Sequence, residues 1–149
     1  MSSKKIESEL DEVQLLFQHK QIDLCLSKIN KIIKNNKNEV LPYNYRGIIF
    51  LSLYRYPEAL IDFNKAISLN PKFAQGYNNI ALTYRSLNRS DHALSAYKKS
   101  LNLNPESIES RINIGILYTE LYLYLEAIES FNYVLKKIPD HEHTHQLIA

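Results

Sequence analysis

Apolar residues recur along this chain with the period of an amphipathic helix. In the middle of the sequence they fall at i, i+3, i+4, i+7 and i+10, which places them on one helical face. These residues are Tyr77, Ile80, Ala81, Tyr84 and Leu87. A second apolar set follows a short polar segment and comprises Ala93, Leu94, Tyr97 and Leu101. The pattern predicts two short helices that pack against each other as a hairpin.

This hairpin pattern returns with a period of 34 residues. Pro71, Pro105 and Pro139 share the spacing, and each disfavours helix at the residue before it, so each ends a hairpin. Glycine inside a helix costs about 1 kcal/mol relative to alanine, so a repeated small residue indicates close helix contact. We expect the first small residue of each hairpin to face the second. Four sets of residues recur at this spacing. Two sets are small, namely Gly47, Ala81 and Gly115, and Ala59, Ala93 and Ala127. Two sets are aromatic, namely Phe50, Tyr84 and Tyr118, and Phe63, Tyr97 and Phe131.

Local signals mark several helix ends. Pro57 can open a helix, because its missing N–H is not needed in the first turn. Ser90 is predicted to cap the helix that follows it, with the charge of Asp91 favourable at a helix N-terminus. After Pro139, Asp140 is predicted to cap a short helix that runs to Ile148.

Taken together, these positions resemble the tetratricopeptide repeat, whose signature sets aromatic, small and proline positions on a 34-residue period. The resemblance is closest over 40–139, although Arg111 replaces the usual first aromatic of its last repeat. Residues 6–39 match only through Leu16, Cys25, Ile29 and Ile32. The matching positions elsewhere are Tyr43, Gly47, Phe50, Ala59, Phe63, Ala66 and Pro71; Tyr77, Ile80, Ala81, Tyr84, Ala93, Tyr97 and Pro105; and Ile114, Gly115, Tyr118, Ala127, Phe131 and Pro139.

The resemblance implies an all-α fold, a right-handed superhelical solenoid of about four helix–turn–helix repeats. We expect a single domain over residues 1–149. Its predicted repeats are a degenerate one at 6–39 and regular ones at 40–73, 74–107 and 108–141, followed by a partial capping helix at 142–149. A terminal repeat lacks a neighbour on one side, which accounts for atypical residues in the first repeat.

Composition narrows the function classes. A net charge of +2 is too small to indicate a nucleic-acid partner. One cysteine in 149 residues cannot form an internal disulfide, and the sequence shows neither a secretory signal nor a membrane span, so we expect a cytoplasmic protein without membrane contact. The sequence has no glycine-rich phosphate loop, nucleophile elbow or paired-cysteine metal spacing. We therefore expect no enzyme activity, cofactor or metal.

The resemblance also implies a binding surface, because the first helix of each repeat lines a concave groove in this family. Asparagine side chains there can pair with a peptide backbone, and a neighbouring aliphatic row can accept apolar side chains. The alternatives are that the asparagines only solvate an exposed face and that the aliphatic row packs within the repeats. The predicted groove residues are Asn44, Tyr45, Ile48, Asn78, Asn79, Leu82, Arg85, Asn113 and Ile116, with Leu51, Ile112 and Glu120 beside them.

Three functions follow from this surface. The sequence favours an adaptor that binds a peptide segment of a partner protein in the groove. A self-associating scaffold, paired through Leu147 and Ile148 at the C-terminal face, is the first alternative, and an RNA-binding helical repeat is the second. A carboxylate clamp for acidic chaperone C-termini is not expected, because Asn44, Glu109 and Asn113 stand where that clamp needs cations.

Other residues are given structural interpretations. His141, His143 and His145 are expected to be solvated rather than to bind a metal. Cys25 stands in place of a packing alanine and is expected to be a buried, inert thiol. Four tyrosines near the hairpin turns are expected to pack within the repeats rather than to form a contact patch: Tyr54, Tyr56, Tyr122 and Tyr124.

Overall fold

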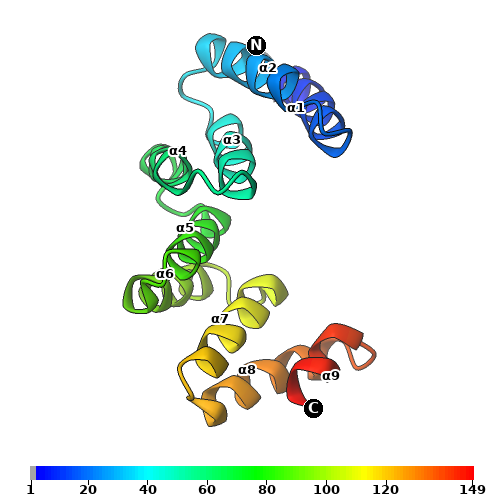
Figure 1. Cartoon of the computed structure of the whole chain (residues 1–149), viewed down its shortest axis with the longest axis vertical. Helices are drawn as coiled ribbons and strands as arrows, with labels where there is room; N and C mark the ends of the chain where they lie inside the picture. The colour runs from blue at the N-terminus through cyan, green and yellow to red at the C-terminus, as the bar shows by residue number, and fades with distance from the viewer. Residues whose placement is uncertain (1–2) are drawn as a thin grey trace. The chain divides into compact units, whose positions relative to one another are not determined.

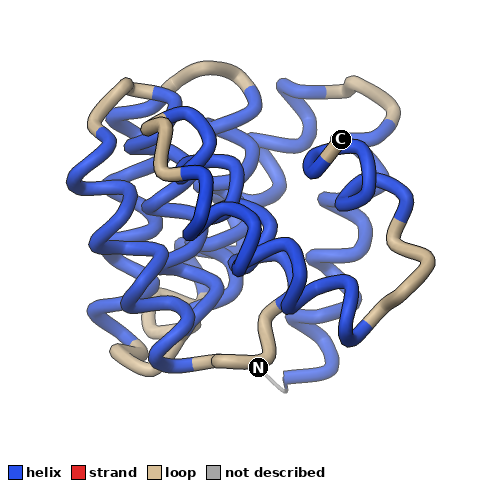
Figure 2. Tube along the Cα trace, turned by 90° about the horizontal axis from the view of Figure 1, so that it is seen from below, coloured by secondary structure: helices blue, strands red, loops and turns tan. Residues whose placement is uncertain are grey.

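The computed structural model describes residues 3–149, and these residues form α-helices joined by short loops, without a strand (Figures 1 and 2). The chain divides into two compact units, Met1–Lys72 (unit 1) and Phe73–Ala149 (unit 2). The expected all-α architecture of helical hairpins is confirmed. Unit 1 contains α1 (Ser3–Gln18), α2 (Ile22–Asn35), α3 (Val40–Ser52) and α4 (Tyr56–Leu69). Unit 2 contains α5 (Ala74–Ser86), α6 (Ser90–Leu103), α7 (Ile108–Glu120), α8 (Tyr124–Lys137) and α9 (Glu142–Ile148).

Each hairpin turns through one residue in the left-handed backbone region. These residues have φ close to 60° and lie 34 residues apart: Lys20, Tyr54, Asn88 and Tyr122. The next residue donates its N–H to the carbonyl five residues back, as Arg55 does to Phe50 at 2.8 Å and Leu123 to Tyr118 at 2.9 Å. This is a Schellman motif, which satisfies carbonyls at the end of the first helix and turns the chain toward the second.

Two predicted helix caps are wrong. Ser90 is the first residue of α6 rather than its cap; Arg89 holds the cap position without a side-chain hydrogen bond. The Schellman turn fixes the entry of the second helix, so a side-chain cap is not needed there. At α9, His141 rather than Asp140 is the cap, and its Nδ1 accepts from the Thr144 N–H at 3.2 Å and lies 2.8 Å from the Thr144 Oγ1.

In unit 1, the α3–α4 hairpin is closed by an aromatic ring over a glycine. A Cβ added at Gly47 would lie 2.5 Å from a ring carbon of Phe63. The atoms nearest to the added Cβ belong to this ring and not to Ala59, which was expected to face Gly47 and is fully buried. Between α1 and α2, the buried Cys25 Sγ donates a weak hydrogen bond to the Val13 carbonyl at 3.4 Å, which confirms the expected buried thiol.

A buried ion pair also joins the helices of unit 1. Arg46 of α3 donates from Nε and Nη2 to the carboxylate of Asp62 of α4, both at 2.7 Å. Its third nitrogen donates to Asn30 Oδ1 of α2 at 2.7 Å. Asp62 is only 1% exposed. One guanidinium therefore ties three helices together, and the carboxylate raises the pKa of Arg46.

In unit 2, apolar residues from α5, α6 and α7 form one core, which consists of Ala81, Ala93, Tyr97, Leu101, Ile114 and Leu117. The glycine–ring contact recurs in the α7–α8 hairpin, where an added Cβ at Gly115 would lie 2.5 Å from the Phe131 ring. The α9 helix packs against α8 and buries Thr144, while Ile148 stays 39% exposed.

Candidate functional site

The predicted groove residues fall in both units, and the structure gives them different surroundings. In unit 1, Asn44, Tyr45 and Ile48 lie on α3. Asn44 is buried, Tyr45 is half-buried, and Ile48 is 38% exposed. The three predicted residues of α3 are thus not equivalent, since only Tyr45 and Ile48 present much surface to a ligand.

These three residues share one wall of a groove between α1 and α3. The groove has a volume of about 360 Å³. On its other wall, α1 contributes Phe17, which the sequence analysis missed because the first repeat lacks the family signature. Its spacing of four from the buried Val13 was the available signal. The lining residues are Val13, Gln14, Phe17, Gln18, Asn44, Tyr45, Ile48 and Ile49.

The groove is lined by neutral side chains. Its apolar surface comes from Phe17, Tyr45 and Ile48, while Gln14 and Gln18 are exposed one helical turn apart on α1. A glutamine amide carries both a donor and an acceptor, so the pair can bond to a polypeptide backbone. The arrangement suits a segment that brings apolar side chains and no strong charge.

In unit 2, two of the three predicted asparagines lie inside the protein. Asn78 is fully buried, and Asn79 is 4% exposed. The Asn78 Nδ2 donates to the Glu109 carboxylate at 2.8 Å, while its Oδ1 accepts from Ser110 and Asn113, both at 3.2 Å. The Asn78 amide therefore holds α5 against α7 and is not free to bind a ligand.

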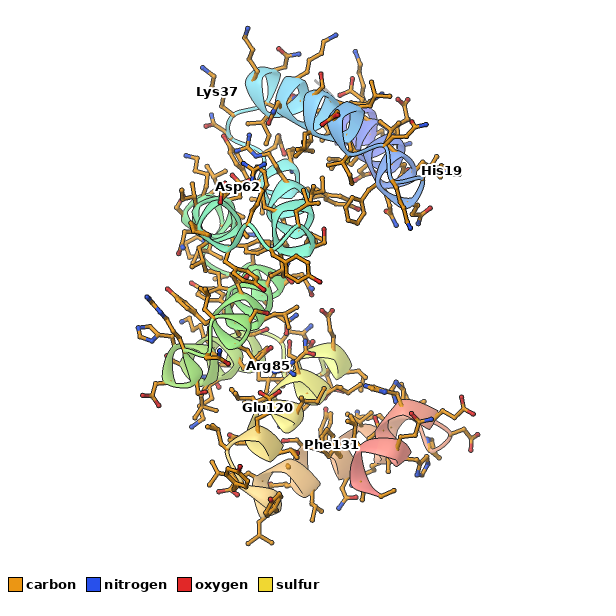
Figure 3. All side chains as sticks on the ribbon, in the orientation of Figure 1. His19, Lys37, Asp62, Arg85, Glu120 and Phe131 are labelled. Carbon is orange, nitrogen blue, oxygen red and sulfur yellow. The ribbon has the colours of Figure 1, made fainter. Side chains whose placement is uncertain are left out.

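Arg85 is engaged in the same way at the other end of these helices. It donates to the Glu120 carboxylate at 2.9 Å and 2.7 Å, and the two labelled side chains lie close together in Figure 3. The carboxylate raises the pKa of Arg85. Of the residues predicted in unit 2, Leu82, Asn113 and Ile116 stay half-buried, so part of their surface is accessible.

The expected packing of the turn tyrosines is wrong for three of the four. Tyr54 and Tyr122 are 79% and 78% exposed, Tyr124 is also exposed, and Tyr56 alone is half-buried. Their contacts are edge-to-face pairs, Tyr54 with Tyr56 and Tyr122 with Tyr124. The left-handed turn residue directs its side chain away from the hairpin, so these rings meet each other rather than the core.

Two of the three C-terminal histidines have local partners. His141 caps α9, and a ring nitrogen of His145 lies 2.7 Å from the Pro139 carbonyl oxygen. Within residues 3–149, no three histidine, cysteine or acidic side chains are grouped to hold a metal ion. In the same range, no helix combines the length and apolar character needed to cross a bilayer.

Comparison with known proteins agrees with this architecture. Family models described as "Tetratricopeptide repeat" match residues 40–73 and 74–107. These ranges contain the α3–α4 and α5–α6 hairpins. No curated protein sequence matches the chain.

Solved structures resemble the whole chain. A crystal structure of MamA is 23% identical, and the match covers 90% of this chain and 78% of that one with a TM-score of 0.76. A tetratricopeptide repeat protein from Parabacteroides merdae ATCC 43184 is 18% identical, covers 99% and 57%, and has a TM-score of 0.82.

The first TPR of Spaghetti (RPAP3), bound to the HSP90 peptide SRMEEVD, is 18% identical to this chain. The match covers 82% of this chain and 97% of that one with a TM-score of 0.72. At these identities the likeness establishes the fold, and the two matched repeats add the sequence signature. The chain is a tetratricopeptide repeat protein, and its repeats are those of a protein–protein interaction module.

Proposed function

We propose that unit 1 binds a segment of a partner protein in the groove between α1 and α3. The observation that carries the proposal is an open groove of about 360 Å³ in which Ile48 remains 38% exposed beside Tyr45 and Phe17. When a ligand covers this apolar surface, the burial favours binding by about 25 cal/mol for each Å².

The lining defines the chemistry of the ligand. Apolar side chains of the partner would contact Phe17, Tyr45 and Ile48, in the manner of a helix or an extended segment laid in a hydrophobic groove. The amides of Gln14 and Gln18 would bond to its backbone at the rim. In unit 2, we assign the accessible surface of Leu82, Asn113 and Ile116 to a second, smaller contact.

Peptides selected against the protein test the groove. Short linear peptides are selected from a displayed library on the wild-type chain, and their affinities are measured for Ile48→Asp. A charge in the middle of the apolar wall should weaken binding about tenfold or more, as at other interface hot spots. Far-UV circular dichroism should stay unchanged, since Ile48 is partly exposed.

The matched control is Ile61→Asp, which places the same charge on α4 at a residue that is 68% exposed and lies outside the groove. It should leave the affinities unchanged. Peptides that bind both variants as tightly as the wild type would exclude the α1–α3 groove as their site.

The neutral lining also predicts what does not bind. The acidic peptide SRMEEVD, labelled with a fluorophore, should show no saturable binding in fluorescence anisotropy, because the groove presents no cation to its carboxylates. Saturable binding that Ile48→Asp abolishes would contradict the proposed ligand chemistry.

A further inference from the structure

The turn between α7 and α8 carries an exposed apolar surface. We call Tyr122, Leu123, Tyr124, Leu125 and Ile128 the apolar tip. Leu125 is 82% exposed and Tyr122 is 78% exposed, and the other three side chains are exposed as well. Several large apolar side chains gathered at one surface position indicate an interaction site, whereas isolated ones do not.

The fold does not require apolar residues there. In the preceding hairpin of unit 2, the positions equivalent to residues 122–125 hold polar residues: Asn88, Arg89, Ser90 and Asp91. Asn88 and Tyr122 have nearly the same backbone conformation, with φ of 56° and 60°. Asparagine tolerates this region, while a bulky tyrosine is disfavoured in it. Tyr122 is therefore unfavourable for the turn and contributes little to the core, which indicates a role in binding.

Acidic side chains border the apolar tip. Glu126 and Glu129 are exposed and form no ion pair within residues 3–149. Residues 112–135 contain three glutamates and no lysine or arginine. The pKa of Tyr118 is raised, first by burial and then by Glu126 and Glu129, so both carboxylates act on the same region. A partner should therefore present apolar and basic side chains together.

This chain has such a surface in unit 1. A second groove, of about 400 Å³, is lined by residues of α1 and α2, and we call it the basic groove. Leu24 stands 60% exposed at its edge, beside Lys28 and Lys31. The lining residues are Glu9, Leu16, Leu24, Ser27, Lys28, Lys31, Ile32 and Asn35.

The α2 wall of the basic groove has a charge opposite to that of the tip, whereas α1 adds one acidic residue, Glu9, to the lining. Residues 24–38 contain four lysines and no acidic residue. Lys28 pairs with Glu12, whereas Lys31 and Lys34 are exposed and make no ion pair in the described part of the chain. The basic groove shares no residue with the α1–α3 groove proposed above.

We propose that the apolar tip of one molecule docks in the basic groove of a second copy of the same chain. Leu123 and Leu125 would enter beside Leu16 and Leu24, and the glutamates of the tip would face Lys31 and Lys34. The two surfaces differ, so the contact is head-to-tail and each molecule keeps one free surface of each kind. Such an interface propagates into rings or chains rather than stopping at a symmetric dimer.

Two variants separate the surfaces. The first gives the tip the polar turn of the chain's own second hairpin, as Tyr122→Asn, Leu123→Arg, Tyr124→Ser and Leu125→Asp. The second reverses the charge at the basic groove, as Lys31→Glu in its lining and Lys34→Glu three residues further along α2. Both change exposed residues, so both should fold, which circular dichroism checks. Tyr54→Asn is the control, because it changes an exposed left-handed tyrosine outside both surfaces.

Sedimentation velocity over a wide range of protein concentration gives the readout. The average mass of the wild type and of Tyr54→Asn should rise with concentration and fall with added salt, since the lysines and glutamates are exposed. Each surface variant alone should stay monomeric. An equimolar mixture of the two should form a heterodimer and stop there, because one intact tip meets one intact basic groove.

That mixing result distinguishes a head-to-tail contact from every symmetric one. A wild type that remains monomeric at all concentrations overturns the proposal and leaves the tip to a different protein. Association that persists in either surface variant, or a mixture that stays monomeric while the wild type associates, overturns it too. The groove between α1 and α3 is unaffected by these results, since the variants do not touch it.

Discussion

The charge of Asp62 is buried in unit 1 and balanced by Arg46, so removing the arginine should destabilise the unit strongly. In the pair, 2% of the Asp62 side chain and 22% of the Arg46 side chain are exposed. Removing one partner of a fully buried pair costs about 3–5 kcal/mol. Because water can approach from the arginine side, the lower end applies, and we expect Arg46→Met to cost about 3 kcal/mol.

Because Asp62 is more deeply buried than Arg46, the variants of this pair should differ in how much folding stability they lose. Asp62→Asn should cost less, about 1–2 kcal/mol, because Arg46 keeps a hydrogen-bond acceptor and its guanidinium can reach water. The double variant Arg46→Met/Asp62→Leu should lie within about 1 kcal/mol of the wild type, since neither charge is left buried alone. The cost of the double variant minus the sum of the two single-variant costs gives the interaction energy of the Arg46–Asp62 pair.

Urea unfolding followed by circular dichroism measures these differences, because urea, unlike guanidinium, does not screen charges. Glu58→Gln is the control. It breaks the exposed pair with Arg55 in the same unit, and the urea midpoint should not move measurably. If Arg46→Met costs no more than Asp62→Asn, or if the double variant is as unstable as Arg46→Met, the argument from the buried carboxylate is wrong.

Three further changes test other parts of the structure. Gly47→Ala should lower the melting temperature, because overpacking against the buried Phe63 ring, at about 1–3 kcal/mol, outweighs the helix-propensity gain of about 1 kcal/mol, and adding Phe63→Leu should restore part of the loss. Tyr122→Asn should raise the thermal stability by about 1 kcal/mol, and an unchanged or lower melting temperature would show that the left-handed tyrosine carries no strain. Burial raises the pKa of the Cys25 thiol, so the folded state holds its proton more tightly and stability should fall as pH rises above the ordinary thiol range. Urea unfolding should show a smaller loss for Cys25→Ala, in which the buried Tyr97, whose pKa is also raised, still contributes.

The helices of the repeats could be predicted because their signals are local. Each proline acts on the residue before it, and the 34-residue spacing repeats that steric rule along the chain. The helix caps were harder to predict from the sequence. A Schellman turn replaces the expected Ser90 cap, and its left-handed position holds Lys20, Tyr54, Asn88 or Tyr122, residue types with no common propensity for it.

The candidate site was less predictable, since residue type does not reveal which way an amide faces. Asn78 and Asn79 lie on the predicted helix but are buried, and the partners of Asn78 are side chains of α7, one repeat further along the chain. Phe17 was missed because α1 matches the signature that identifies the other repeats only at Leu16. Such contacts depend on how neighbouring hairpins pack, which no single-repeat pattern records.

The polar bonds between α5 and α7 have a consequence for how such a chain can evolve. Gln75 and Asn78 meet Glu109, and Arg85 meets Glu120, so each bond joins unlike residues from successive hairpins. If the segment 74–107 were duplicated in tandem, Arg85 of the first copy would meet the duplicate of Ser86 instead of a carboxylate, and Gln75 would meet another glutamine. The repeats share a shape yet are not interchangeable modules, and their order along the chain is fixed by complementary chemistry at each junction.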